Sequence, residues 1–384
     1  MFLIYTFYYT NRQTADIFRY YDDARLILQH LQIKPFATYD FLQGHFTSEN
    51  YSLRVSVNNW ENAKHSYSSN HVMIIMNAGL ILVSAGDYLI QMMFFTFLSF
   101  VGLMALFKVF SKYSQTPPGV LFVLLFLLPS ILFWTSGILK EALTIFGLGL
   151  MIFHFSKFIS NAATYLDLIG IIAVMLMLAF LKFYVVLIVL PCLLILSIVR
   201  KLIKRHSVSI AWWFAGVSLF YLLMFLFSHY VGSINVLTAL IEKRKAFIVL
   251  AQQMNAGSYF STPDFSNYSQ LIVALPRAFI NTLLRPFSDW SNPFIVISAI
   301  ENAVVLLLTL VAMYNRKKQT DLNLLCVSVV VAGFSLLGLI VPVEGALVRY
   351  KSIFLPFLMI WIADNIDLNA MASRYGFIKK IINI

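Results

Sequence analysis

Apolar runs close to the length of a membrane span recur along most of the chain. A helix needs about 20 residues to cross the hydrocarbon core, and shorter runs are expected where helices tilt or break. The runs predict spans at residues 88–107, 119–134, 142–155, 166–181, 183–199, 208–228, 294–314, 322–341 and 353–363. The pattern predicts an all-α, polytopic transmembrane helical bundle of about nine to eleven spans, forming a single membrane domain over residues 1–384.

Two long polar segments interrupt these runs, at residues 10–87 and 229–293. Each contains a stretch of apolar residues at helical spacing, 72–83 in the first and 236–251 in the second. The second stretch also carries Lys243, Arg244 and Lys245, a combination typical of helices that lie in a membrane interface. We therefore expect interfacial helices in both long loops.

Composition supports the membrane interpretation. The chain is 60% hydrophobic and 12% charged, whereas an ordinary soluble domain is about half apolar and a quarter charged. The net charge of +11 comes from short basic clusters between spans, so no nucleic-acid partner is expected. Cys192 and Cys326 lie inside apolar runs, and the histidines show no metal-ligand spacing. No cofactor is expected, and nothing in the sequence supports a divalent metal.

The chain begins with an apolar, aromatic stretch at residues 1–9, which is too short to span a membrane. It lacks the basic region and the small-residue cleavage site of a signal peptide. We interpret it as the end of a first helix that begins upstream, or as a short interfacial anchor.

The positions of lysine and arginine predict one orientation. Short loops rich in these residues face the cytoplasm, and the clusters fall at alternate loops: Lys108 with Lys112; Lys157; Arg200, Lys201, Lys204 and Arg205; Arg316, Lys317 and Lys318; and Arg374, Lys379 and Lys380. This alternation requires residues 166–199 to form a hairpin around Lys182. We expect a multi-pass protein of a bacterial inner membrane whose remaining loops, and active site, face the periplasm.

Three carboxylates open the first outer loop, namely Asp16, Asp22 and Asp23. Partial desolvation near a membrane surface raises the pKa of a carboxylate, which suits a general base. On a helix, Asp16, Tyr20 and Asp23 would share one face. The alternative is a solvated acidic helix start that is balanced by neighbouring arginines.

Further ionisable residues lie at the ends of the predicted spans or inside them. Lys140 could bind a phosphate and Glu141 a sugar hydroxyl, or the two could form an interfacial ion pair. Arg285 ends the second long loop, and Glu301 is the one acidic residue well inside a predicted span. We expect Glu301 to have a partner or a function, with a structural role favoured.

The last outer turn contains Glu344, Arg349, Tyr350 and Lys351. Arg349 and Lys351 are cations on the side where cations are disfavoured, and an arginine can bind a phosphate through two parallel hydrogen bonds. A lipid-phosphate headgroup would explain their position. Non-specific binding to bulk membrane lipids is the alternative.

These motifs resemble those of the GT-C superfamily of membrane glycosyltransferases. In the branch similar to protein mannosyltransferases and lipid A aminoarabinose transferase, the first-loop motif is Asp-Glu-x-x-Tyr-x-x-x-Ala, which Asp16, Tyr20 and Ala24 match. Ile17 departs from it, because the second acid should stand there, and Asp22 or Asp23 would supply that carboxylate. Residues 133–141, 284–290 with Glu301, and 345–350 also look like those of uncharacterised bacterial relatives.

The resemblance implies transfer of a sugar from a polyprenyl-phosphate carrier to a glycan, lipid or protein acceptor. Asp16 would be the catalytic base, and Arg349 with Lys140 or Arg285 would stabilise the leaving phosphate, near Tyr350 and Lys351. One alternative is a polysaccharide polymerase or ligase of the O-antigen type, which Arg277 and the basic residues 243–245 would suit. The other is a transporter of lipid-linked sugars, but no inverted repeat is evident.

Overall fold

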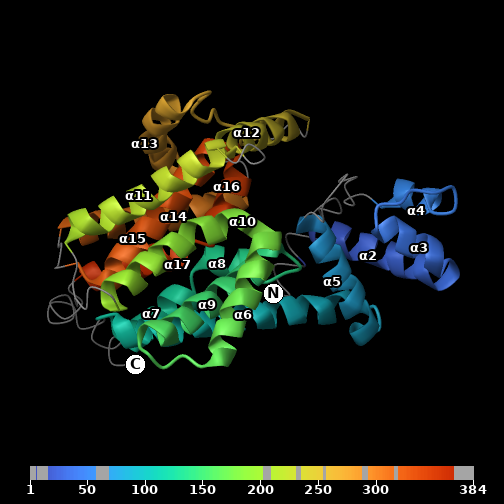
Figure 1. Ribbon diagram of the computed structural model, residues 1–384, viewed down its shortest axis with the longest axis horizontal. Coiled ribbons are helices and arrows are strands. Elements are labelled where there is room, and N and C mark those ends of the chain that lie inside the picture. Colours follow the sequence, from blue (N-terminus) through green and yellow to red (C-terminus); the bar gives the residue numbers. More distant parts are fainter. Residues whose placement is uncertain are drawn as a thin grey trace. The chain divides into compact units, whose positions relative to one another are not determined.

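The computed structural model describes Thr6 and residues 16–57, 69–201, 209–230, 235–253, 257–287, 293–314 and 319–366. Within these residues every regular element is a helix (Figure 1), and the only strand-like pairing is an isolated bridge between Tyr259 and Val343. The predicted all-α class is confirmed for this part of the chain. The basic residues 204–205, 316–318 and 374–380, like most of residues 1–9, lie outside it.

Six of the described helices are long and apolar enough to cross a membrane. They are α6 (Tyr88–Tyr113), α9 (Lys140–Ile159), α10 (Tyr165–Lys201), α11 (Ile210–Tyr230), α14 (Pro293–Tyr314) and α15 (Asp321–Ile340). Two bent pairs bring the number of spans to as many as eight: α7 (Pro118–Phe126) with α8 (Pro129–Thr135), bent by 52°, and α16 (Glu344–Lys351) with α17 (Leu355–Asn365), bent by 64°. Pro129 stands at the first break, because a proline disfavours helical backbone in the residue before it. Pro356 lies in the first turn of α17, where a proline is tolerated.

The long helix α10 is counted as one of these spans, although the chain folds back on itself within it. Its backbone leaves the helical region at Lys182 (φ −150°, ψ 76°). Near its start, Asp167 is 2.8 Å from Lys157 in the last turns of α9, and near its end Arg200 shares a pocket with Ser156 and Ile159. A straight helix of 37 residues would hold its ends about 55 Å apart. The structure therefore agrees with the predicted hairpin around Lys182.

The chain divides into two compact units. Unit 1 comprises residues 1–105, 133–151 and 168–186, and unit 2 comprises residues 106–132, 152–167 and 187–384. The helices α6, α9 and α10 contribute residues to both.

In the described part of the first polar segment, unit 1 contains four helices: α2 (Asp16–Ile33), α3 (Pro35–Leu42), α4 (Tyr51–Ser56) and α5 (Ser69–Ser84). The helix α5 covers the stretch predicted to be helical at 72–83. One buried cluster joins α2 and α5 to α6 and to the start of α9, through residues such as Ile17, Ile74, Phe95 and Leu143. This shared core fixes the start of α2 beside the start of α9.

Within unit 1, α6 and α9 approach each other at two glycines. A Cβ atom added to Gly149 would fall on the carbonyl oxygen of Gly102, and one added to Gly102 would fall on the backbone of Ile145. Small residues allow such backbone approach, which stabilises helix pairs in membranes through van der Waals packing.

Replacing Gly149 by alanine should therefore destabilise the protein, by about 1–3 kcal/mol, because the helices must separate to admit the methyl group. The measurement is the midpoint of thermal unfolding in detergent. Gly79→Ala in α5 is the matched control, since nothing lies within 4 Å of its added Cβ, and it should leave the midpoint unchanged or raise it slightly. Equal midpoints for Gly149→Ala and wild type would contradict the close contact.

Unit 2 contains α12 (Val236–Gln253), which covers the helix predicted at 236–251, and α13 (Tyr268–Leu284), which was not predicted. The buried face of α13 consists of Leu271, Ala274, Ala278 and Thr282, and its main partner is α15. Thr282 donates a hydrogen bond of 2.7 Å to the carbonyl oxygen of Phe334. Part of the second long loop is therefore packed against a span. Whether α5 and α12 lie in a membrane interface stays a prediction.

Several of the predicted cytoplasmic cations gather at one end of unit 2, which we call the basic end. Lys108 and Lys157 both lie over the ring of Phe153, at 5.3 and 4.8 Å from its centroid, and Arg200 lies 5.8 Å from that of Tyr113. These residues come from α6, α9 and α10. The arrangement agrees with the predicted topology, in which these loops share one side of the membrane.

Candidate active site

The predicted catalytic residues lie on the first turns of α2, in unit 1. Asp16 begins the helix and is half-buried, whereas Tyr20 and Asp23 are buried on the face that packs against α5. Ile17, which stands where the related motif has its second acid, is fully buried in the hydrophobic cluster of this unit. A carboxylate there would be desolvated without compensation, so the environment explains why an apolar residue occupies the position.

Asp22 points away from that face and is exposed. Partial desolvation of its carboxyl raises its pKa above the usual value, and the positive charge of Arg25 opposes the shift. Asp22 therefore does not share a face with Asp16, and Asp23 is the acid that does.

A hydrogen-bonded cluster connects α2 to the start of α9. Lys140 donates to Asn70 Oδ1 at 2.6 Å and to Ser69 Oγ at 2.7 Å, and Tyr20 donates to the same Asn70 oxygen at 3.2 Å. The Lys140 ammonium also lies 5.6 Å from the centre of the Tyr20 ring. Two motifs that are far apart in the sequence thus meet around Asn70. Sequence reasoning did not select Asn70, because a lone asparagine carries no recognisable pattern.

The neighbouring Glu141 forms a buried ion pair with Lys182 at the break in α10. The Lys182 ammonium is 2.6 Å from Glu141 Oε1, and the side chains are only 5% and 0% exposed. The sequence had suggested Lys140 as the partner of Glu141, whereas the structure assigns Lys182. The signal in the sequence is the single lysine inside the apolar run 166–199, which indicates a buried partner as well as a turn.

A second group of predicted residues lies in unit 2. Arg285 donates to Glu344 Oε1 at 2.7 Å, and its guanidinium lies 4.0 Å from the centre of the Phe260 ring. Glu344 is fully buried and also accepts a hydrogen bond of 3.3 Å from the Phe287 backbone. The remainder of the Arg285 motif, residues 288–292, lies outside the described residues.

Lys351 and Glu301 lie in the same part of unit 2. Lys351 is 4% exposed and donates to Asn302 Oδ1, while Ser130 donates to Glu301 Oε2 through its backbone nitrogen (2.9 Å) and its hydroxyl (2.8 Å). Both residues border a cavity of about 10 Å³, enough for one water molecule. An acidic residue inside a span needs a partner, and Ser130 is the partner of Glu301. Ser130 and Asn302 had not been selected.

Arg349 and Tyr350, on the short helix α16, are half-buried. The Arg349 guanidinium lies 5.8 Å from the Tyr350 ring, which packs edge-to-face against Phe247 of α12 at 6.2 Å. The predicted donor-binding residues Arg285, Arg349, Tyr350 and Lys351, with Glu301 and Glu344, therefore belong to unit 2. Asp16, Tyr20, Lys140 and Glu141 belong to unit 1.

Comparison of the chain with protein-family models, with curated proteins and with solved structures gave no match. Among the described residues, no group of three or more histidine, cysteine or acidic side chains is arranged to hold a metal ion. The functional argument therefore rests on the two groups of residues themselves.

Proposed function

We propose that the protein is an integral membrane glycosyltransferase of the GT-C type. It would transfer a sugar from a polyprenyl-phosphate carrier to a glycan, lipid or protein acceptor on the outer face of a bacterial inner membrane. The reaction would be an inverting transfer, as expected when one carboxylate activates the acceptor and the lipid phosphate leaves directly.

The meeting of α2 and α9 is the observation that supports this proposal best. The first-loop motif contributes Asp16 and Tyr20, and the second motif contributes Lys140, which contacts the Tyr20 ring and shares Asn70 with its hydroxyl. The half-buried carboxylate of Asp16, one helical turn from this cluster, supports a role as the general base. The burial of the Asp23 side chain on the face that packs against α5 is not expected of a solvated acidic helix start.

In this proposal Asp16 accepts the proton of the acceptor hydroxyl as the bond from that oxygen to the sugar forms. The bond between the sugar and the phosphate breaks at the same time, and the phosphate leaves with both bonding electrons. The developing charge is stabilised by cations: Lys140 is the candidate within the unit that carries Asp16, and Arg349 and Arg285 are the candidates that the resemblance implies. Glu344 orients Arg285 through their 2.7 Å ion pair.

The test is a transfer assay with the purified protein and a radiolabelled polyprenyl-phosphate sugar, in which both labelled product and released polyprenyl phosphate are measured. Arg349→Ala should reduce the transfer rate about 10²- to 10³-fold, because a donor aimed at the developing charge is lost. Arg277→Ala, at an exposed position of α13, is the control and should retain full activity.

The two alternatives predict different results in the same assay. A polymerase or ligase of the O-antigen type would use lipid-pyrophosphate chains and would lose activity in Arg277→Ala. A transporter would move the labelled lipid across a vesicle membrane without releasing polyprenyl phosphate. Either result would overturn the proposal.

A further inference from the structure

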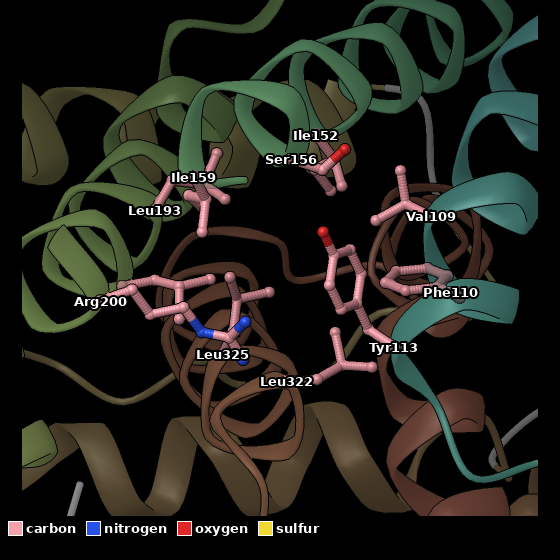
Figure 2. Close-up of a pocket in the computed structure, with 11 residues that line it drawn as sticks. Val109, Phe110, Tyr113, Ile152, Ser156, Ile159, Leu193, Arg200, Leu322 and Leu325 are labelled. Carbon is pink, nitrogen blue, oxygen red and sulfur yellow. The ribbon is translucent and has the colours of Figure 1, made fainter. Parts of the chain in front are cut away.

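An apolar slot opens at the basic end of unit 2, between the ends of α6, α9 and α10 and the start of α15 (Figure 2). Its walls are mainly aliphatic and aromatic side chains such as Phe110, Leu193 and Leu325. The cavity between these walls has a volume of about 40 Å³ and is open on one side. Three residues with polar groups border it, namely Tyr113, Ser156 and Arg200. The slot is thus an apolar channel with polar groups at its rim.

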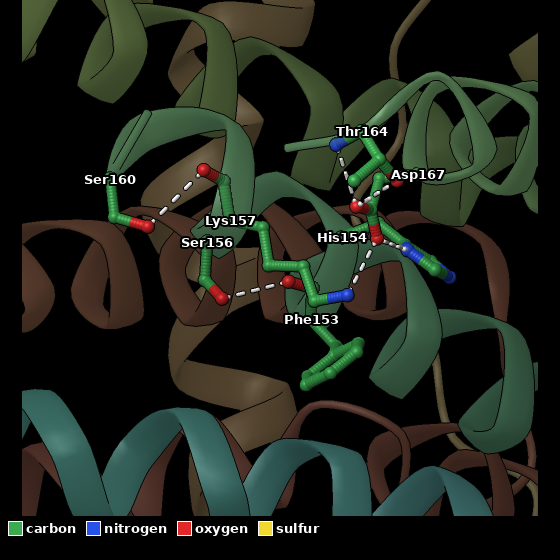
Figure 3. Close-up of polar contacts among 7 residues, drawn as sticks. All are labelled: Phe153, His154, Ser156, Lys157, Ser160, Thr164 and Asp167. Carbon is green, nitrogen blue, oxygen red and sulfur yellow. Dashed lines mark hydrogen bonds and ion pairs between the residues drawn. The ribbon is translucent and has the colours of Figure 1, made fainter. Parts of the chain in front are cut away.

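The region around this slot carries more positive than negative charge. Five cations lie on the three helices that end here: Lys108, Lys112, Lys157, Arg200 and Lys201. Three carboxylates face the same region: Asp167 is bound by Lys157, His154 and Thr164 (Figure 3), Asp321 by Arg200, and Asp364 by Ser114 and Thr116. Lys108, Lys112 and Lys201 form ion pairs with none of the described carboxylates and lie against aromatic rings instead. The region therefore retains a net positive charge.

The groups at the rim have unused capacity for hydrogen bonds. Arg200 donates to Asp321 through Nε at 3.1 Å, and its two terminal nitrogens have no hydrogen-bond partner among the described residues. In Figure 2 the Tyr113 hydroxyl points toward Ser156 across the slot. The Ser156 hydroxyl itself donates to the carbonyl oxygen of Phe153 at 2.7 Å. A guanidinium with free terminal nitrogens, next to Lys201, is well suited to a phosphate group.

We propose that this slot binds one anionic phospholipid, with its phosphate at Arg200, Lys201 and Lys112 and the first part of an acyl chain between α6, α9 and α10. The apolar walls offer nothing to an inorganic anion, whereas they match a hydrocarbon chain. The excess of cations favours an anionic over a zwitterionic headgroup. The site also lies at the end of the unit where the positive-inside rule places the cytoplasmic leaflet, which is rich in anionic lipid. The proposal does not depend on the glycosyltransferase assignment.

The experiment is native mass spectrometry of the purified protein in detergent, titrated with dioleoyl phosphatidylglycerol, dioleoyl phosphatidylcholine or glycerol phosphate at low ionic strength. Phosphatidylglycerol should bind with a stoichiometry of one, and tighter than phosphatidylcholine. The variant Lys112→Gln with Lys201→Gln should weaken that binding about thirtyfold, since each cation near a membrane surface contributes about a fivefold gain in affinity for anionic lipid. Both lysines lack carboxylate partners among the described residues, so the variant should fold.

The matched control is Lys243→Gln with Lys245→Gln, which removes the same charge from exposed positions of α12 and should leave the tight site intact. A second variant, Ser156→Phe, fills the slot without changing charge and should also weaken binding of phosphatidylglycerol. Equal binding of the two phospholipids, or equal losses in the two double variants, would overturn the proposal in favour of non-specific headgroup contact. Displacement of the lipid by glycerol phosphate would show a free-anion site instead.

Discussion

Asp16→Asn is expected to reduce the rate of sugar transfer by about 10²- to 10⁴-fold, the contribution typical of a general base. The amide has nearly the same shape as the carboxylate and can occupy the same place at the start of α2. It cannot accept a proton from the acceptor hydroxyl. The expected loss therefore lies in kcat, with little change in the binding of the polyprenyl-phosphate donor.

The measurement is the initial rate of labelled product formation, together with donor affinity measured separately by binding. Asp40→Asn on α3 makes the same chemical change at a position outside the predicted motif and should leave the rate unchanged. Asp23→Asn tests the second acid on the buried face of α2. Normal turnover by Asp16→Asn would exclude Asp16 as the base, and loss only in Asp23→Asn would transfer that role to Asp23.

The largest effect on stability is expected at the buried pair between Lys182 and Glu141. Lys182→Met should lower the free energy of unfolding by about 3–5 kcal/mol, because it removes the ammonium that lies 2.6 Å from a carboxylate that is 0% exposed. The break in α10 at Lys182 would lose its contact with the start of α9. The measurement is unfolding by SDS titration in mixed micelles.

A double-mutant cycle separates this effect from any catalytic role of Glu141. Glu141→Gln with Lys182→Met removes both charges, and its stability should exceed the value expected from adding the two single losses. Asp264→Asn is the control, because Asp264 is 88% exposed and its 2.7 Å pair with Arg244 should contribute at most about 1 kcal/mol. If the double variant is stable but inactive in sugar transfer, Glu141 takes part in the reaction as well.

Part of the candidate site was predictable because it depends on local chemistry. The acidic start of α2, the Lys140–Glu141 dipeptide and Arg285 stand out as charges beside apolar runs, and such charges require a partner or a function. The partners were not predictable. Asn70 and Asn302 are single residues in unremarkable contexts, and Lys182 stands out only as a lone charge in an apolar run. Only the packing of distant helices brings them to Lys140, Lys351 and Glu141.

The sequence by itself determined the helical class, the apolar segments and the hairpin around Lys182, and it predicted that Lys108, Lys157 and Arg200 share one end. These features follow from hydrophobic length and from the distribution of lysine and arginine, which are properties of consecutive residues. The tertiary structure alone decided that α13 packs against α15, that Ile17 belongs to a core, and which carboxylate pairs with which cation. Those outcomes depend on contacts between segments far apart in the chain, where close packing and desolvation select one partner among several that the sequence leaves equivalent.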